Sequence, residues 1–470
     1  MMCHRSRPGP DSTAACLAAA ALLVLAPGDG AAQRSRAESV RLMDSIAASP
    51  VVEGRVAGLA AAVVRGSDTL LIKGYGKADL EWDAAMTSDA VFEIGSVTKQ
   101  FTAAAILQLR DAGKLDLDAD ITRYLPDYPV NGRRIPVRRL LDHTSGIKGY
   151  TEMRSFREIN TRALPRDTLV GRFAAEPFDF EPGEALIYNN SGYFLLGLII
   201  EKVSGMSYED YVEKELFAKL GMHRSSYCSN SDVVPRRAHG YNLANGSTLE
   251  RAPYLDHTWP YAAGSLCSTT VDLITWLRAL RGGSVLPPAS YQEMITPGSL
   301  NDGTKVRYAM GLARTPDARG RPAIHHGGGI FGFVSDTRYY PDEDLYVVVL
   351  VNTTGNLSPA AIATEMVDVL LPRPQVAMRA FEGDAAPLVG TYAGAARGQT
   401  LTVKVALNGN GLTLAPEGAQ RPAPLSWVEG WTFTLGGQIV TFERNGSNGP
   451  AAVVRLDSGG GHYVLRRQGS

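Results

Sequence analysis

Two strand-rich segments lie far apart in this chain, and the residues between them have the pattern of helices and loops. Residues 57–64 and 69–75 are apolar runs joined by Arg65-Gly66-Ser67-Asp68, which predicts a hairpin with a short turn. Strand-like runs return at 308–312, 334–340 and 345–351. We therefore expect an α+β fold in which one antiparallel sheet is assembled from distant parts of the chain, flanked by helices and interrupted by an all-helical subdomain.

Helical patterns occupy the intervening region and both of its borders. The clearest runs from Ser96 to Asp111, with good helix formers, no internal glycine or proline, and Gly113 as a C-terminal cap. Further helices are expected at 37–49, 193–203, 208–220, 271–281 and 359–371. The region around the sheet is thus predominantly helical.

A boundary is expected at Pro372-Arg373-Pro374, after which short strands alternate with glycine and asparagine turns. These strands are expected at 401–407, 412–414, 431–435, 439–442, 452–456 and 463–465. They predict a small β-sandwich or barrel. The expected division is a leader at 1–32, a main domain at 33–372, a linker at 373–384 and an all-β domain at 385–470.

The first 32 residues have the pattern of a secretory signal peptide. Basic residues precede an uncharged apolar run at 14–26, which is too short to span a bilayer, and small residues follow at 30–32. We therefore expect export to the periplasm or medium, with no stable membrane anchor after cleavage. The mature chain would keep two cysteines, Cys228 and Cys267, which could form a disulfide or remain buried thiols.

Composition limits the partners of this chain. The 470 residues carry a net charge of −1, which gives no electrostatic footprint for nucleic acid. The two cysteines have no histidines at ligand spacing, so no metal site and no cofactor are expected. A small substrate is the expected partner, and the sequence leaves the oligomeric state open.

The segment Ser96-Val97-Thr98-Lys99 has the arrangement needed for a nucleophilic serine. Ser96 begins the predicted helix, where the dipole and unpaired N–H groups favour negative charge. Lys99 lies on the same face three residues later, and a buried lysine with a lowered pKa can accept the proton of a hydroxyl. A capping serine beside a solvated lysine would produce the same four letters.

Two further segments strengthen the catalytic interpretation. Tyr188-Asn189-Asn190 precedes a predicted helix, and His326-Gly327-Gly328-Gly329 lies among the returning strands. In order, these three motifs resemble the S-x-x-K, Y-x-N and H-x-G motifs of the serine β-lactamase and penicillin-binding superfamily, in its class C-like branch of esterases, D-aminopeptidases and D-alanyl-D-alanine carboxypeptidases. Flanking matches occur at 113–118 and 140–147, and the resemblance extends from about Gly58 to Val369. It implies a β-lactamase-like fold.

The resemblance also implies roles for individual residues. Ser96 would be the nucleophile, Lys99 its activator, and Tyr188 the general base that then protonates the leaving group. Substrate binding is implied for Asn190, His326, Gly328 and Gly329. The N–H of Gly329 would complete an oxyanion hole with that of Ser96. For Tyr188 to act as a base at neutral pH, its pKa must fall well below about 10.

These roles describe a serine hydrolase that cleaves an ester, an amide or a D-peptide through an acyl-enzyme. A lysine in the third motif would carry a fixed charge, whereas His326 is mostly neutral at pH 7, which favours an esterase or peptidase over a true β-lactamase. His143 and His325 are interpreted as structural. The C-terminal domain has no evident catalytic group and is expected to dock against or shield the cleft. The alternative is a non-catalytic binding or assembly protein on the same fold.

Overall fold

The computed structural model describes residues 34–371 and most of 381–469, except positions 410, 420, 445, 447, 448 and 459. The predicted leader at 1–32 and residues 372–380, which include part of the predicted linker, lie outside the described residues. Within the described part, no helix is both long and apolar enough to cross a membrane.

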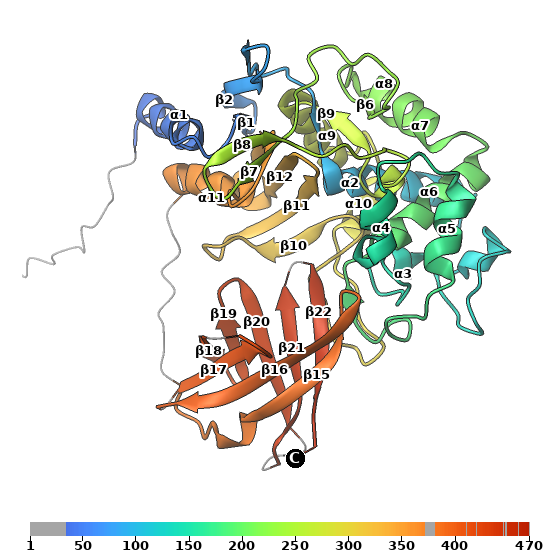
Figure 1. Ribbon diagram of the computed structural model, residues 1–470, viewed down its shortest axis with the longest axis vertical. Helices are drawn as coiled ribbons and strands as arrows, with labels where there is room; N and C mark the ends of the chain where they lie inside the picture. Colours follow the sequence, from blue (N-terminus) through green and yellow to red (C-terminus); the bar gives the residue numbers. More distant parts are fainter. Residues whose placement is uncertain are drawn as a thin grey trace, which may run out of the picture. The chain divides into compact units, whose positions relative to one another are not determined.

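A seven-stranded antiparallel sheet forms the centre of the main domain, in the order β10-β11-β12-β13-β1-β2-β3 (Figure 1). Its strands are β1 (Gly58–Arg65), β2 (Asp68–Asp79), β3 (Ala84–Ala85), β10 (Ala313–Pro316), β11 (Pro322–Ile330), β12 (Phe333–Tyr340) and β13 (Leu345–Val351). The N-terminal hairpin pairs with the C-terminal strands, because Ala62 of β1 lies opposite both Ile72 and Val348. The predicted assembly of one sheet from distant segments is confirmed.

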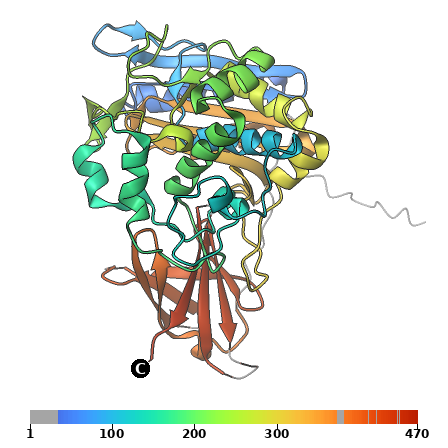
Figure 2. The same ribbon diagram turned by 90° about the vertical axis from the view of Figure 1, so that its right-hand side faces the viewer.

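Helices cover both faces of this sheet. Along β1, Leu59, Ala61 and Val63 pack into one core with α1 (Arg36–Val52) and α11 (Pro359–Leu370). The alternate residues of β1 belong to the other core, which the inserted helices share. Figures 1 and 2 show helices on either side of the sheet. Successive side chains of a strand point to opposite faces, so a strand apolar at every position is buried on both sides.

The inserted region is mostly helical, whereas the sequence predicted an all-helical subdomain: short strands also form within it. Its helices are α2 (Thr98–Asp111), α3 (Val137–Leu141), α4 (Arg154–Ile159), α5 (Arg166–Ala174), α6 (Asn190–Ser204), α7 (Tyr208–Tyr211), α8 (Ala218–Leu220), α9 (Thr270–Arg281) and α10 (Pro288–Met294). Two small sheets accompany them, β4-β9-β6 and β14-β7-β8. Their strands are β4 (Phe92–Glu93), β6 (Ser226–Tyr227), β7 (Tyr241–Ala244), β8 (Thr248–Arg251), β9 (Leu266–Ser268) and β14 (Thr353–Thr354).

The predicted strand at 308–312 is wrong. Tyr308 makes only an isolated bridge with Ala313, and the strand β10 begins at Ala313. Gly311 has a φ of +72°, and a Cβ there would lie 2.5 Å from the carbonyl oxygen of Lys99. The segment therefore bends at this glycine and packs against the helix of the first motif.

The C-terminal segment forms an antiparallel barrel, closed by pairing of its first and last strands. Its strands are β15 (Gly390–Ala396), β16 (Gln399–Asn408), β17 (Gly411–Pro416), β18 (Ala423–Glu429), β19 (Thr432–Leu435), β20 (Gln438–Arg444), β21 (Ala451–Ser458) and β22 (Gly461–Arg467). Sequence analysis missed β15 and β18. The first is rich in alanine and glycine and the second contains a proline, so both lack the composition typical of strands.

The barrel also pairs with the main domain. Strand β5 (Leu186–Ile187) lies antiparallel to β22, with Ile187 opposite Gly461. The next residue, Tyr188, donates its backbone N–H to the carbonyl of Gly460 at 3.1 Å. The backbone that leads into the second motif is therefore held by the barrel.

Candidate active site

Ser96 lies in a tight turn, Gly95–Val97, that leads directly into α2. Gly95 in this turn has a φ of +52°, which favours glycine. A Cβ at Gly95 would lie 2.9 Å from the backbone nitrogen of Gly329 on β11. The turn therefore places Ser96 next to β11, the strand that carries the third motif.

Lys99 is completely buried one turn after Ser96. Its amine nitrogen lies 3.2 Å from Ser96 Oγ and donates to Asn190 Oδ1 and to the carbonyl of Ala263, both at 2.8 Å. Burial lowers the pKa of Lys99 well below its usual value. A neutral amine has two N–H groups and one lone pair, so the two carbonyl-type acceptors leave the lone pair for the hydroxyl of Ser96. An amine held in this way can act as a base for the serine.

Tyr188 follows β5 directly and lies beside the same amine, with Lys99 Nζ 4.7 Å from the centre of its ring. Its phenolic oxygen is buried and has no hydrogen-bond partner among the described residues. The Ser96 hydroxyl is near enough to lower the pKa of Tyr188, but burial outweighs it, and the pKa is raised above its usual value of 10.0. Burial therefore opposes the lowered pKa that the general-base role of Tyr188 would need, and that role stays a prediction.

Asn190 joins the lysine to the neighbouring loop. It is the first residue of α6, its Oδ1 accepts from Lys99, and its Nδ2 donates to Thr151 Oγ1 at 3.1 Å. Both ends of the amide are thereby used within the protein. Asn190 also lines the cavity at Ser96, where the resemblance places it.

His326 on β11 is buried, with only 6% of its surface exposed. Its Nδ1 lies 2.6 Å from the carbonyl of Gly327, which can only accept, so Nδ1 carries the proton and Nε2 accepts from Tyr308 Oη at 2.8 Å. Burial is the main cause that lowers the pKa of His326, to about 3. The ring is neutral with both nitrogens engaged, so its side chain supports the site rather than offering a free substrate contact.

The two glycines assigned to substrate binding have different surroundings. A Cβ at Gly328 would lie 2.1 Å from the carbonyl oxygen of Ile94 and 2.2 Å from Ser335 Oγ. Gly328 therefore allows β11 to pack against the backbone that precedes Ser96. A Cβ at Gly329 would meet nothing within 4 Å, and Gly329 lines the cavity.

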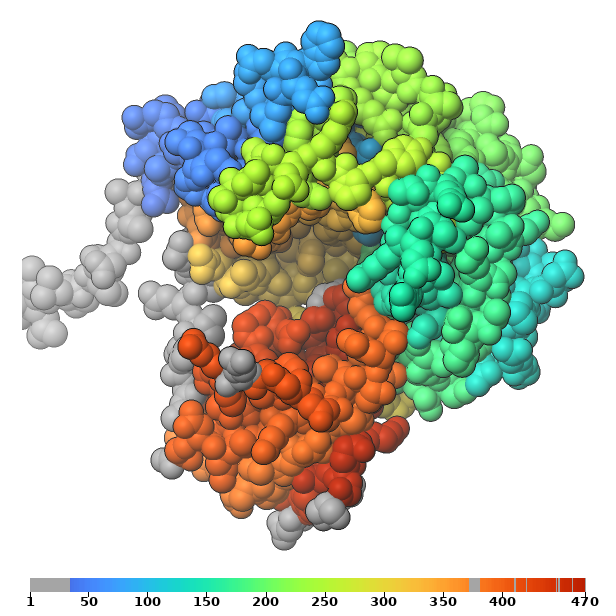
Figure 3. Space-filling view, viewed as in Figure 1, coloured from blue at the N-terminus to red at the C-terminus, as the bar shows by residue number. Residues whose placement is uncertain are grey.

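A cavity of about 330 Å³ opens at Ser96. Its lining is largely apolar and comprises Gly95, Ser96, Tyr150, Thr151, Phe156, Asn190, Leu255, Pro260, Ala263, Gly264, Gly329, Ile330, Phe331 and Thr354. The surface in Figure 3 is hollowed between the segments around residues 150–160 and 250–260 and the sheet. A larger cavity, of about 620 Å³ between 124–129 and 195–202, contains none of the three motifs. The smaller cavity can therefore hold the apolar part of a substrate at Ser96.

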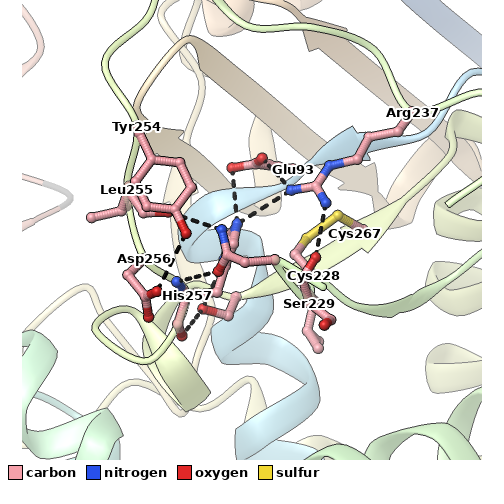
Figure 4. A network of polar contacts seen from close by, with 12 residues as sticks. Glu93, Cys228, Ser229, Arg237, Tyr254, Leu255, Asp256, His257 and Cys267 are labelled. Atoms are coloured by element: carbon pink, nitrogen blue, oxygen red, sulfur yellow. Dashed lines mark hydrogen bonds and ion pairs between the residues drawn. A yellow bond between two sulfur atoms is a disulfide. The ribbon is translucent and has the colours of Figure 1, made fainter. Parts of the chain in front are cut away.

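A buried ionic cluster supports the strand that precedes Ser96 (Figure 4). Glu93 on β4 pairs with Arg237 at 2.7 Å and lies 3.4 Å from His257 Nε2. Burial alone would raise the pKa of Glu93, but its hydrogen bonds and charge interactions with His257 and Arg237 outweigh burial and lower it. Glu93 is therefore ionised at neutral pH.

The same cluster holds the loop that supplies the carbonyl of Ala263. Ser265 Oγ lies 3.1 Å from His257 Nδ1 and donates to the carbonyl of His257 at 2.9 Å. Cys267 of the neighbouring strand β9 forms a disulfide with Cys228. The sequence had left open whether these two cysteines are bonded or remain thiols. The backbone carbonyl of Ala263, which accepts from Lys99, is therefore held in place by the hydrogen bonds between Ser265 and His257 and by the disulfide.

Sequence analysis missed three groups that touch the site. Ala263 acts through its backbone carbonyl, which no sequence pattern reveals. Tyr308 and Thr151 contact His326 and Asn190, respectively, from segments with no motif. His143, interpreted as structural, accepts from the backbone N–H of Asn189 at 3.1 Å and packs 4.3 Å from the ring of Tyr188.

Comparisons with known proteins identify the family of this chain. The sequence model of the Beta-lactamase family matches residues 40–370. The chain is 30% identical over 305 residues to "Penicillin-binding protein 4*" of Bacillus subtilis (strain 168), a match that covers 61% of this chain and 66% of that protein.

Two of the solved structures similar to this chain cover most of it. The D-stereospecific amidohydrolase from Streptomyces sp. has 26% identity and a TM-score of 0.60, covering 73% of this chain and all of that one. The octameric penicillin-binding protein homologue from Pyrococcus abyssi has 26% identity and a TM-score of 0.62, covering 91% of this chain and all of that one.

Proposed function

The chain belongs to the Beta-lactamase family, and on that premise we propose that it hydrolyses an ester or amide through an acyl-enzyme on Ser96. The observation that carries this proposal is the position of Lys99, whose buried amine lies 3.2 Å from Ser96 Oγ with its other two partners both acceptors. A serine needs a base before it can attack a carbonyl, and this amine is one.

Acylation begins when Ser96 attacks the substrate carbonyl and passes its proton to Lys99. The new ammonium lies beside the ring of Tyr188, and a positive charge at this distance lowers the pKa of the phenol. Tyr188 thereby becomes a better acid at the moment when the leaving group needs a proton. Deacylation uses the same groups in reverse, with water in place of the leaving group.

The developing oxyanion is stabilised by backbone N–H groups of Ser96 and Gly329 in this mechanism. Ser96 lies in the first turn before α2, where N–H groups have no helical partner. Gly329 offers open space on the cavity side, so a substrate carbonyl can approach its backbone closely.

The substrate class follows from the cavity and from the third motif. The lining accepts an apolar acyl group, and the neutral His326 provides no fixed charge, which favours an ester or peptide over a β-lactam. The D-stereospecific amidohydrolase is a relative named for amide substrates of D configuration, and we extend that class to this chain as the second candidate. The Cys228–Cys267 disulfide supports an exported enzyme.

A substrate panel tests this proposal. Short acyl esters, D-alanyl peptide amides and a chromogenic cephalosporin are compared by kcat/KM with the intact protein and with Ser96→Ala. We expect turnover of an ester or D-peptide that disappears in the variant. Turnover that persists in Ser96→Ala contradicts the proposal, and binding without turnover favours the non-catalytic alternative.

A further inference from the structure

One side chain of the C-terminal barrel reaches the active site. Arg397 lies in the turn between β15 and β16, and its guanidinium pairs with Glu152 at 2.8 Å. The same guanidinium lies 5.5 Å from the centre of the Tyr188 ring. A domain in which the sequence predicted no catalytic group therefore places a cation at the second motif.

The turn that carries Arg397 is shaped for this approach. Gly398 has a φ of +69°, and a Cβ there would lie 2.9 Å from the Cβ of Glu152. Only glycine satisfies both conditions without a shift of the backbone. Because β22 also pairs with β5 just before Tyr188, the barrel fixes the position of Arg397 relative to Tyr188.

A chain of hydrogen bonds links this arginine to the nucleophile. Arg397 binds Glu152 Oε1, and Thr151 Oγ1 donates to Glu152 Oε2 at 3.0 Å. Thr151 accepts from Asn190, which in turn accepts from Lys99. The position of the guanidinium is therefore coupled to the catalytic amine rather than set by a loose surface contact.

The guanidinium keeps capacity for a second partner. Glu152 Oε1 engages only its Nε and one terminal nitrogen, and 46% of the Arg397 side chain is exposed, against 15% for Glu152. Among the described residues close to Tyr188, the other basic groups are occupied or neutral. Lys99 and His326 are buried, and Lys148 pairs with Asp179 at 2.8 Å.

We propose that Arg397 determines specificity by binding a carboxylate on the leaving group of the substrate. This inference rests on the proposed function, in which Tyr188 protonates that leaving group. Neither Tyr188 nor Arg397 is among the described residues that line the apolar cavity, so the acyl group occupies the cavity and the leaving group lies at the tyrosine, next to the guanidinium. The substrate class is then an apolar acyl ester or amide whose leaving group carries a free carboxylate, which an arginine binds with paired N–H groups.

A matched pair of esters tests this assignment. The butanoyl ester of 3-hydroxybenzoate is compared with the butanoyl ester of methyl 3-hydroxybenzoate, which lacks only the free carboxylate. The unmodified protein should prefer the carboxylate, and Arg397→Gln should reduce the ratio of the two kcat/KM values by about 10- to 100-fold. Arg397→Lys should retain part of the preference. An equal ratio in the unmodified protein and Arg397→Gln overturns the inference.

The control is another barrel arginine that also lies over an aromatic ring. Arg444 lies 4.7 Å from the ring centre of Trp431, and Arg444→Gln should leave the substrate ratio unchanged. A loss of the preference in both variants would assign the effect to the barrel as a whole and overturn a specific role for Arg397. Thermal unfolding of all variants identifies any that fail to fold.

Phosphonylation of Ser96 separates this inference from the proposed function. Aryl phosphonates with a 3-carboxyphenyl or a 3-(methoxycarbonyl)phenyl leaving group are compared by the rate of mass increase at Ser96. Faster labelling by the carboxylate that is lost in Arg397→Gln supports the inference. Labelling of Ser96 at a ratio independent of Arg397 overturns the inference and leaves the proposed function intact. If neither reagent labels Ser96, the proposed function fails, and the inference fails with it.

Discussion

The amine of Lys99 lies 3.2 Å from the hydroxyl oxygen of Ser96, buried among groups that accept both of its remaining N–H bonds. In the proposed mechanism Lys99 is therefore the base for Ser96, because the lone pair of its neutral amine is free to accept the proton of the hydroxyl. In the same mechanism Tyr188, whose pKa is raised by burial, begins protonated and donates its proton to the leaving group.

The lysine predicts a pH profile. Lys99 must be neutral to act as a base, so kcat/KM should rise as the pH rises through the pKa of Lys99. Because burial holds this pKa well below its usual value, activity should already be present at neutral pH. Lys99→Arg, which stays protonated, should lose about 10²- to 10⁴-fold in kcat/KM. The exposed Lys214→Arg serves as the control. A Lys99→Arg variant with an unchanged profile contradicts this role.

The tyrosine predicts a dependence on the leaving group. Tyr188→Phe removes the proton donor but keeps the ring, so an alkyl ester or anilide should lose about 100-fold or more in kcat. A 4-nitrophenyl ester should lose far less, since nitrophenolate departs without a proton. The two rates are measured on the same preparation. Equal losses for both substrates would mean that Tyr188 acts before departure of the leaving group.

The third motif predicts a contrast between neighbouring glycines. Gly328→Ala places a methyl group against the carbonyl of Ile94 and the hydroxyl of Ser335, so it should lower the free energy of unfolding by about 1–3 kcal/mol and disturb the turn at Ser96. Gly329→Ala meets open space and should unfold like the parent. Denaturant titrations of both variants check this. Similar stabilities for the two would show that β11 can move away from Ile94.

The buried cluster predicts a pH-dependent stability. The pKa of Glu93 is lower in the folded than in the unfolded chain, so its stabilising contribution is present above the unfolded pKa and is lost as the pH falls through the folded pKa. Glu93→Gln should therefore be less stable than the parent by about 2 kcal/mol at pH 7, and the difference should narrow below about pH 4. Unfolding measured across this range checks the sign. A difference that does not vary with pH would contradict it.

Much of the fold was predictable, because it follows from the local spacing of apolar residues along the sequence. The hairpin at β1 and β2 and the helix after Ser96 follow from apolar spacing and from glycine at their ends. The i, i+3 spacing predicted that Lys99 can reach Ser96, and the two groups lie 3.2 Å apart, although Ser96 lies in the turn before α2 and not in the helix. The prediction of a strand at 308–312 was wrong because the chain bends at Gly311 and packs against Lys99. This is a tertiary contact that no local sequence pattern contains.

The remaining features of the site depend on burial and on long-range pairing. The raised pKa of Tyr188 results from its burial, whereas the general-base role implied by the resemblance needs a lowered pKa. The pairing of Cys228 with Cys267 depends on β6 lying next to β9. Arg397 reaches Tyr188 through a strand pairing between two domains, which neither composition nor motif spacing could indicate.

The covalent state of Ser96 tests the central claim most directly. The protein is incubated with a fluorophosphonate, and the intact mass and the modified peptide are determined by mass spectrometry. We predict one adduct, on Ser96, that forms more slowly in Lys99→Arg and is absent in Ser96→Ala. A protein that stays unmodified, or one modified at another residue while Ser96 remains free, would contradict the account.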